Sequence, residues 1–104
     1  MAGKKNPIDG IDPVIHERVR LGIMSCLAGT EEMSFNEIKD ILNLTDGNLS
    51  AHALVLENAG FIKIEKSFEG KKPKTTVKIS PKGKTAFGKY LQLLERMLKR
   101  GKEI

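Results

Sequence analysis

Apolar residues recur at helical spacing in three stretches of the first sixty residues. The first stretch follows Asp12 and Pro13, which suit the N-cap and first position of a helix, and Gly29 is expected to end it. Its apolar positions fall at i, i+4, i+7, i+8, i+11 and i+12, on one helical face: Ile15, Val19, Gly22, Ile23, Cys26 and Leu27. A first helix is therefore predicted from Asp12-Pro13 onward.

Two further helices are predicted, each with its own capping residues. Ser34 and Glu37 have the spacing of a capping box, and Asn43 suits a left-handed C-cap. The second helix is expected to bury one apolar face: Phe35, Ile38, Ile41 and Leu42. Thr45 can cap a third helix that ends at Ala59-Gly60. The buried positions of this third helix recur at i, i+4 and i+7: Leu49, Ala53 and Leu56.

From residue 61 the apolar spacing changes to the alternation typical of β-strands. One face of the first alternating stretch carries Ile62, Ile64 and Phe68, and the second stretch carries Thr75, Val77 and Ile79. The basic, turn-rich sequence EGKKPK lies between them, so a two-stranded hairpin with a basic tip is predicted. Ser80-Pro81 repeats the cap-plus-proline signal, and eight of the thirteen residues 86–98 are apolar, which predicts a last helix.

The order of these elements is that of a winged helix-turn-helix domain, which presents its third helix to the DNA major groove. Three segments, LNLTDGNLSAHALVLENAGFI, F-EGKKPKTTVKIS and SPKGK-AF--YLQLLE, also resemble the MarR/ArsR-like winged-helix transcriptional regulators, over roughly residues 13–95. The resemblance implies a winged-helix fold, sequence-specific binding of double-stranded DNA and an active homodimer. We expect a mainly α-helical α+β fold with a small β-hairpin. A flexible segment at 1–12 would precede the domain at 13–104, whose long C-terminal helix, at about 81–100, would serve dimerisation.

The positive charge of the chain is concentrated in its second half. The formal net charge is +5 and the pI about 9.4, which is compatible with a polyanionic partner. Residues 30–60 carry one base against six acids, whereas residues 61–80 carry six bases against two acids. Because the helix-turn-helix is acidic, two alternatives to DNA binding stay open. One is a protein-interaction module of winged-helix shape. The other is an RNA-binding winged helix in which Phe61 and Phe68 stack on bases.

The third helix opens on Asp46, Gly47 and Asn48, all poor formers of a helix interior. A recognition helix must bring its N-terminal end close to the DNA backbone, and small residues allow that approach. The DNA-contacting residues expected in this helix are Thr45, Gly47, Asn48, Ser50, Ala51, His52 and Leu54. The outward face is uncharged, so electrostatic attraction is expected mainly from the hairpin lysines Lys71, Lys72 and Lys74, and from the last helix.

The last helix carries an apolar stripe that is too wide for a lone surface helix. Its 4-3-4 spacing is that of a helix–helix seam, and one set of residues can cover the domain's own core while another meets a second copy. The expected interface residues are Phe87, Tyr90, Leu91, Leu94, Met97 and Leu98.

Other chemistry is weakly indicated. A phosphate contact and a structural role are both open for His52. A packing or capping role is expected for His16, and an inert buried thiol for Cys26. We find no usable spacing of a carboxylate pair, a nucleophile–base set, a phosphate loop or metal ligands, so no enzyme, cofactor or metal site is expected. A small-molecule effector has no support in the sequence, and would have to bind between helices or at the dimer interface.

No membrane association is expected, because no apolar run approaches the roughly 18 residues of a membrane span. The N-terminal residues also lack the apolar segment of a signal peptide. The default expectation is a cytoplasmic protein.

Overall fold

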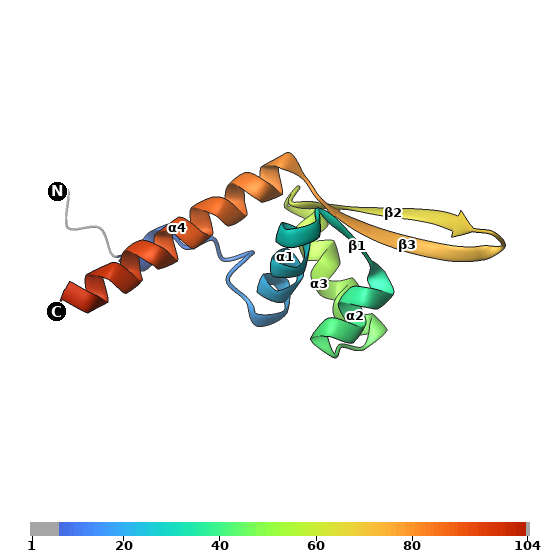
Figure 1. The fold of residues 1–104 in the computed structure, drawn as a ribbon, viewed down its shortest axis with the longest axis horizontal. Helices are drawn as coiled ribbons and strands as arrows, with labels where there is room; N and C mark the ends of the chain where they lie inside the picture. The colour runs from blue at the N-terminus through green and yellow to red at the C-terminus, as the bar shows by residue number, and fades with distance from the viewer. Residues whose placement is uncertain (1–6, 104) are drawn as a thin grey trace.

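The computed structural model describes residues 7–103 of the chain. Within these residues it contains a short 3-10 helix, four α-helices and a three-stranded antiparallel sheet of order β1-β3-β2. The elements are η1 (Pro7–Gly10), α1 (Arg18–Thr30), β1 (Glu32–Ser34), α2 (Phe35–Leu42), α3 (Asp46–Asn58), β2 (Ile62–Glu69), β3 (Lys72–Ile79) and α4 (Pro81–Glu103). The mainly α-helical α+β fold predicted from the sequence is confirmed (Figure 1).

The first helix begins later than predicted, at Arg18 instead of Pro13. The Asp12 carboxylate accepts a hydrogen bond from the Val14 N–H at 2.9 Å and so caps a turn, but that turn does not continue. Glu17 has extended backbone angles, and its own carboxylate accepts hydrogen bonds from the N–H groups of Val19 and Arg20. Two acids therefore compete as N-cap, and the second one starts the helix.

The end of α1 also differs from the prediction. Gly29 lies within the helix, which runs to Thr30 and is closed by Glu31 at a φ of 68°. The Glu31 N–H donates to the Leu27 carbonyl at 2.7 Å, which satisfies one of the helix-end carbonyls. The buried stripe of the helix is nevertheless close to the predicted one, because Ile15, Val19, Ile23 and Leu27 all lie in the core.

The predicted caps of α2 and α3 are confirmed. Ser34 Oγ accepts from the Glu37 N–H at 3.1 Å, and Thr45 Oγ1 accepts from the Asn48 N–H at 3.1 Å. Asn43 closes α2 in the left-handed region, at a φ of 52°. The prediction that Ile41 is buried is wrong, because its side chain is 61% exposed. Ile41 lies about 100° around the helix from Leu42, outside the face that packs on α1.

The sheet contains one strand that the sequence pattern did not predict. β1 pairs with β3 in antiparallel register, from Glu32 opposite Lys78 to Ser34 opposite Thr76. β2 and β3 form the predicted hairpin, from Ile62 opposite Ile79 to Glu69 opposite Lys72. Its two-residue loop starts with Gly70 at a φ of 66°, which glycine adopts without steric cost. Only the base of the hairpin is buried, and its outer half projects away from the helices (Figure 1).

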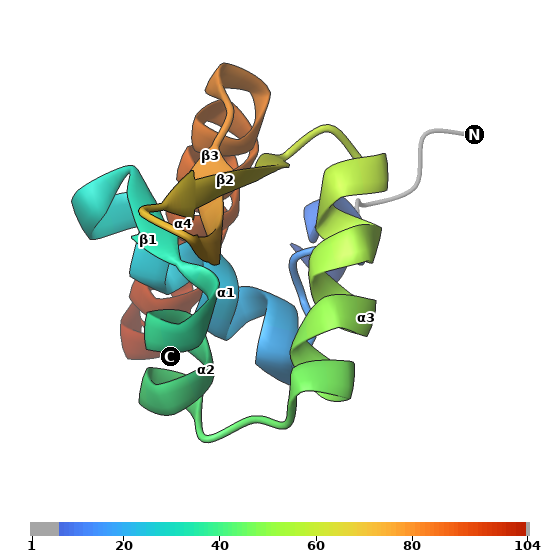
Figure 2. The same cartoon turned by 90° about the vertical axis from the view of Figure 1, so that its right-hand side faces the viewer.

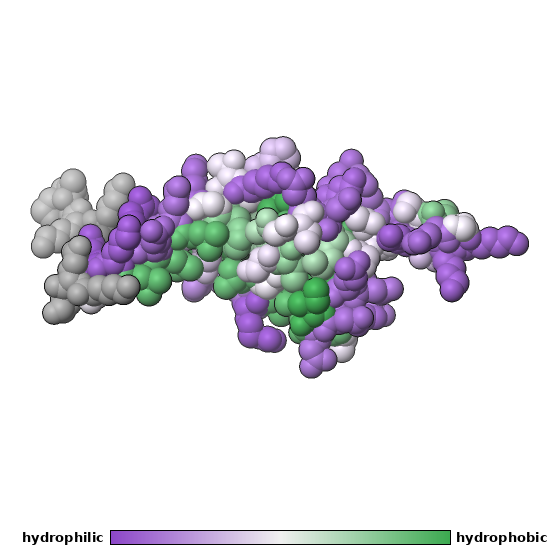
Figure 3. Space-filling view, viewed as in Figure 1, coloured by the Kyte–Doolittle hydropathy of each residue, from purple (hydrophilic) through white to green (hydrophobic). Residues whose placement is uncertain are grey.

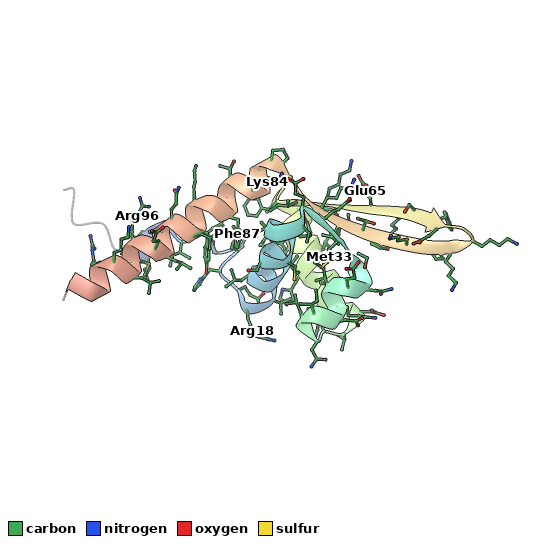
Figure 4. The ribbon with its side chains drawn as sticks, viewed as in Figure 1. Arg18, Met33, Glu65, Lys84, Phe87 and Arg96 are labelled. Atoms are coloured by element: carbon green, nitrogen blue, oxygen red, sulfur yellow. The ribbon has the colours of Figure 1, made fainter. Side chains whose placement is uncertain are left out.

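Helix α4 joins the hairpin base to the opposite end of the molecule. Its first turn is fixed by Ser80, whose Oγ accepts from the Gly83 N–H at 2.9 Å and donates to the Gly60 carbonyl. Phe87 and Tyr90 then enter the core, and Figure 4 shows Phe87 directed from α4 toward α1. The C-terminal half of α4 extends beyond the core, so the molecule measures 60 × 27 × 22 Å.

The N-terminal segment expected to be flexible lies partly outside the described residues. Residues 7–10 form η1, which lies near α4: a Cβ added at Gly10 would be 3.4 Å from Leu93 Cδ2. Ile11 and Val14 pack against the core. The described part of this segment thus covers one side of α4.

Candidate nucleic-acid interface

Helix α3 stands at the edge of the domain, with one face buried and the other open. Leu49, Ala53 and Leu56 are fully buried against the core. The opposite face points away from the body of the domain (Figure 2). This open face carries exposed residues that the sequence had indicated as DNA contacts: Thr45, Gly47, Asn48, Ser50, Ala51 and Leu54. The helix therefore presents a surface of small and polar side chains together with the exposed Leu54.

The start of α3 leaves room for a close approach. A Cβ added at Gly47 would meet no atom within 4 Å, so the surface here is open. The neighbouring acid, Asp46, forms an ion pair with Lys39, in which Lys39 Nζ lies 2.9 Å from Asp46 Oδ1. The hydrogen bond from Lys39 to Asp46 raises the pKa of Lys39. The single base of residues 30–60 is thus engaged, and the surface offers hydrogen-bonding groups without an unpaired positive charge.

His52 takes part in contacts within the domain. Its Nδ1 lies 3.0 Å from Arg20 Nη1 and 3.4 Å from Glu17 Oε1, so α3 is tied to the start of α1. Partial burial by itself raises the pKa of Glu17. The backbone N–H groups of Arg20 and Val19, with His52 and Arg20 nearby, outweigh it and hold that pKa below its usual range. Of the two roles left open for His52, this geometry favours the structural one.

The other histidine is exposed but hydrogen-bonded, and the cysteine is half-buried. His16 Nδ1 lies 2.8 Å from the Tyr90 hydroxyl, which joins the turn before α1 to α4. Cys26 is half-buried, and burial raises the pKa of its thiol. Among residues 7–103, no group of three His, Cys, Asp or Glu side chains is placed to hold a metal ion. In the same part of the chain, no helix is long and apolar enough to cross a membrane.

The charges of the hairpin are paired at its base, whereas at its tip only some of them are paired among the described residues. At the base, Lys78 Nζ lies 3.2 Å from Glu65 and 3.6 Å from Glu32, and the hydrogen bond from Lys78 holds the pKa of Glu65 below its usual range. At the tip, Lys74 pairs with Glu69 at 3.4 Å. Within the described residues no ion pair involves Lys66, Lys71 or Lys72. Nitrogen-tipped side chains project from the end of the hairpin (Figure 4).

A groove of about 660 Å³ separates the open face of α3 from the hairpin. It is lined by residues of both elements and of α2: Phe35, Ser50, Ala53, Leu54, Glu57, Ile64, Lys66 and Thr75. The Glu57 carboxylate accepts a hydrogen bond from the Ile64 N–H at 3.0 Å and so links α3 to β2. Helix and hairpin are thereby held next to each other across this groove.

A second candidate surface is an apolar band on the distal half of α4, which also carries charged residues. The structure places Phe87 and Tyr90, two of the expected interface residues, in the core of their own domain. Leu91 and Leu98 are 47% and 69% exposed, while Leu94 and Met97 are half-buried. An apolar band along this helix is visible in Figure 3. Ile8 of η1, which the sequence pattern did not single out, is also an exposed apolar residue.

Comparison with known proteins identifies the family. The sequence model of the family described as winged helix DNA-binding domain matches residues 19–98. The uncharacterized protein MJ0432 of Methanocaldococcus jannaschii is 42% identical over 78 residues, which cover 75% of this chain and 85% of that protein.

Two solved structures share the fold. The transcriptional regulator homologue from Pyrococcus horikoshii OT3 has a TM-score of 0.79 and 34% identity, over 83% of this chain and 85% of that one. YusO from Bacillus subtilis is 16% identical, with a TM-score of 0.67 over 88% of this chain and 60% of that one, and shows the fold alone. The resemblance to winged-helix transcriptional regulators drawn from the sequence is confirmed: the chain belongs to the winged helix DNA-binding domain family.

Proposed function

We propose that the protein is a cytoplasmic, homodimeric transcriptional regulator that binds double-stranded DNA in a sequence-specific manner. Helix α3 enters the major groove, and the hairpin contacts the backbone or the minor groove. The observation that carries this proposal is that two exposed surfaces belong to elements that line one groove. The open, small-residue face of α3 lies next to a hairpin tip whose lysines Lys66, Lys71 and Lys72 are unpaired within the described residues.

The two surfaces have different roles in this proposal. Asn48 and Ser50 reach base edges, while Ala51 and Leu54 contact thymine methyl groups. Because these side chains are small and uncharged, each base pair is discriminated by about 1 kcal/mol, at the low end of the usual range. The hairpin supplies sequence-independent attraction to phosphate.

Genome-wide selection of bound duplex fragments, followed by a salt titration on the best fragment, tests the proposal. A logarithmic affinity that falls linearly with the logarithm of salt concentration is expected. A protein that binds no duplex even at low salt would instead be the protein-interaction module. The engagement of Lys39 by Asp46 on the acidic helix-turn-helix is the observation that favours this second candidate.

Alanine replacement of a hairpin lysine is expected to weaken binding to all duplexes about equally. Each of Lys71→Ala and Lys72→Ala should lower the salt slope by about one unit, because each removes one phosphate contact. Lys74→Ala should have a smaller effect, since Glu69 already pairs with that lysine. Anisotropy titrations against a selected and a random duplex, repeated at several salt concentrations, measure the affinity and the salt slope. The control is Lys84→Ala, whose amine binds Glu31 at 2.8 Å. A changed sequence preference at an unchanged slope would contradict this role.

The dimer is expected to form through the distal half of α4. Leu98→Glu should weaken self-association by about a hundredfold, because two unpaired carboxylates would be buried in each dimer. Sedimentation at tens of micromolar, roughly the range in which a modest interface is still populated, measures the change. Ile41→Glu is the matched control, since Ile41 is a similarly exposed apolar residue on α2. A wild-type monomer in this range would contradict the interface.

A further inference from the structure

The hairpin tip, residues 66–74, carries an exposed aromatic side chain among its lysines. Phe68 lies near the end of β2, opposite Pro73 of β3, and is 75% exposed. Figure 3 shows an isolated apolar patch near the end of the hairpin, surrounded by hydrophilic residues. An exposed phenylalanine gains nothing from the core of its own domain, and a large apolar ring is usually buried or used at an interface.

The strand alternation fixes the face on which Phe68 lies. Side chains at Ile62, Ile64, Lys66 and Phe68 share one face of β2, and the opposite β3 positions on that face include Pro73 and Thr75. Ile64, Lys66 and Thr75 line the groove beside α3. Phe68 and Pro73 therefore continue, beyond the end of that groove, the hairpin face that lies toward α3.

The charges around this apolar pair indicate the chemistry of its partner. Lys66 lies on the same face and Lys71 lies in the loop. Lys72 lies on the opposite face of the hairpin, together with the ion pair between Glu69 and Lys74. None of these three lysines has an ion-pair partner among the described residues. An apolar side chain on a hairpin that carries unpaired lysines on both of its faces suits the DNA minor groove, where phosphates line both edges and apolar side chains can insert between base steps.

We propose that Phe68, supported by Pro73, is an apolar wedge that the hairpin inserts into the minor groove of the bound duplex. There it partly unstacks one base step, and the site consequently favours the readily deformed pyrimidine–purine steps at that position. This inference rests on the proposed function and assigns to the hairpin a share of sequence choice through DNA deformability. The lysines of the tip retain their sequence-independent role.

The test uses the full chain and a duplex taken from the selected fragments, with 2-aminopurine scanned through the base steps that flank the half-sites. Wild-type protein is expected to raise the fluorescence of the probe at one step on each side, because that step loses stacking. Phe68→Ala should remove this rise and weaken binding about tenfold at an unchanged salt slope, as expected for a lost aromatic contact to bases. Phe68→Leu should keep part of the fluorescence rise and part of the affinity.

The matched control is Lys71→Ala, at the same tip, which should lower the salt slope while a saturating concentration still gives the fluorescence rise. Equal affinity and equal fluorescence for wild type and Phe68→Ala would overturn the wedge and leave the proposed function standing. Binding of wild type to no duplex at low salt would overturn the proposed function and the wedge together. Tighter binding to single-stranded RNA than to duplex, lost in Phe68→Ala, would overturn the wedge and assign Phe68 to stacking on unpaired bases.

Discussion

Replacing Gly47 with leucine is expected to abolish binding to both selected and random duplexes without unfolding the protein. A Cβ at this position would have no atom of the domain within 4 Å, so the protein can accommodate the side chain. The side chain would instead occupy the space that DNA needs. A leucine there would hold the N-terminal end of α3 away from the sugar-phosphate backbone. The affinity for the best site should fall at least about a thousandfold, the lower end of what specific contacts usually contribute.

Anisotropy titrations, with circular dichroism as a check of folding, measure this effect. Gly29→Leu is the matched control, because Gly29 is also helical, exposed and free of neighbours within 4 Å, but lies at the end of α1. This control should bind like wild type. A folded Gly47→Leu protein with normal affinity would mean that α3 is not the reading helix, and the protein-interaction role would replace the DNA-binding one.

Replacing Gly83 with alanine is expected to have the largest effect on stability. A Cβ at this position would lie 2.0 Å from the Phe61 carbonyl oxygen, which also accepts a hydrogen bond from the Ser80 N–H. Because the obstacle is backbone, relief requires α4 to move away from the hairpin base. The free energy of unfolding should fall by about 3 kcal/mol, at the upper end of the usual cost of overpacking.

Urea unfolding measures this loss, with Gly88→Ala as the control in the same helix. Gly88 has no neighbour within 4 Å of an added Cβ, so its replacement should stabilise the protein by up to about 1 kcal/mol through helix propensity. Equal unfolding midpoints for Gly83→Ala and Gly88→Ala would show that the first turn of α4 does not lie against Phe61.

Local signals predicted much of the fold. The caps at Ser34, Asn43 and Thr45 act over three or four residues, so their sequence spacing was sufficient to place α2 and α3. The same local view misplaced the start of α1, because Asp12 and Glu17 both offer capping carboxylates and only the fold decides between them. Strand β1 has three residues, too few for alternation to be seen, and it is defined by its pairing with β3.

The exposed residues of the candidate site could be predicted from the sequence, because the helical period separates buried from exposed positions. The outward residues of α3 follow from the buried stripe of Leu49, Ala53 and Leu56. The contacts of His52 with Glu17 and Arg20 could not be predicted, because they join residues more than thirty positions apart. Nor could periodicity assign Phe87 and Tyr90 to the domain's own core, since α4 carries apolar residues on more than one side.

Hydroxyl-radical footprinting of the wild-type protein on its best selected fragment tests the central claim most directly. Two copies of α3, related by a two-fold axis, should protect two symmetric patches about one helical turn, roughly 10 bp, apart or a multiple of that distance. The hairpins should add protection of the flanking backbone, and salt should weaken the whole pattern together. A single asymmetric patch, or no protection at low salt, would contradict a dimer that reads a palindromic duplex through α3.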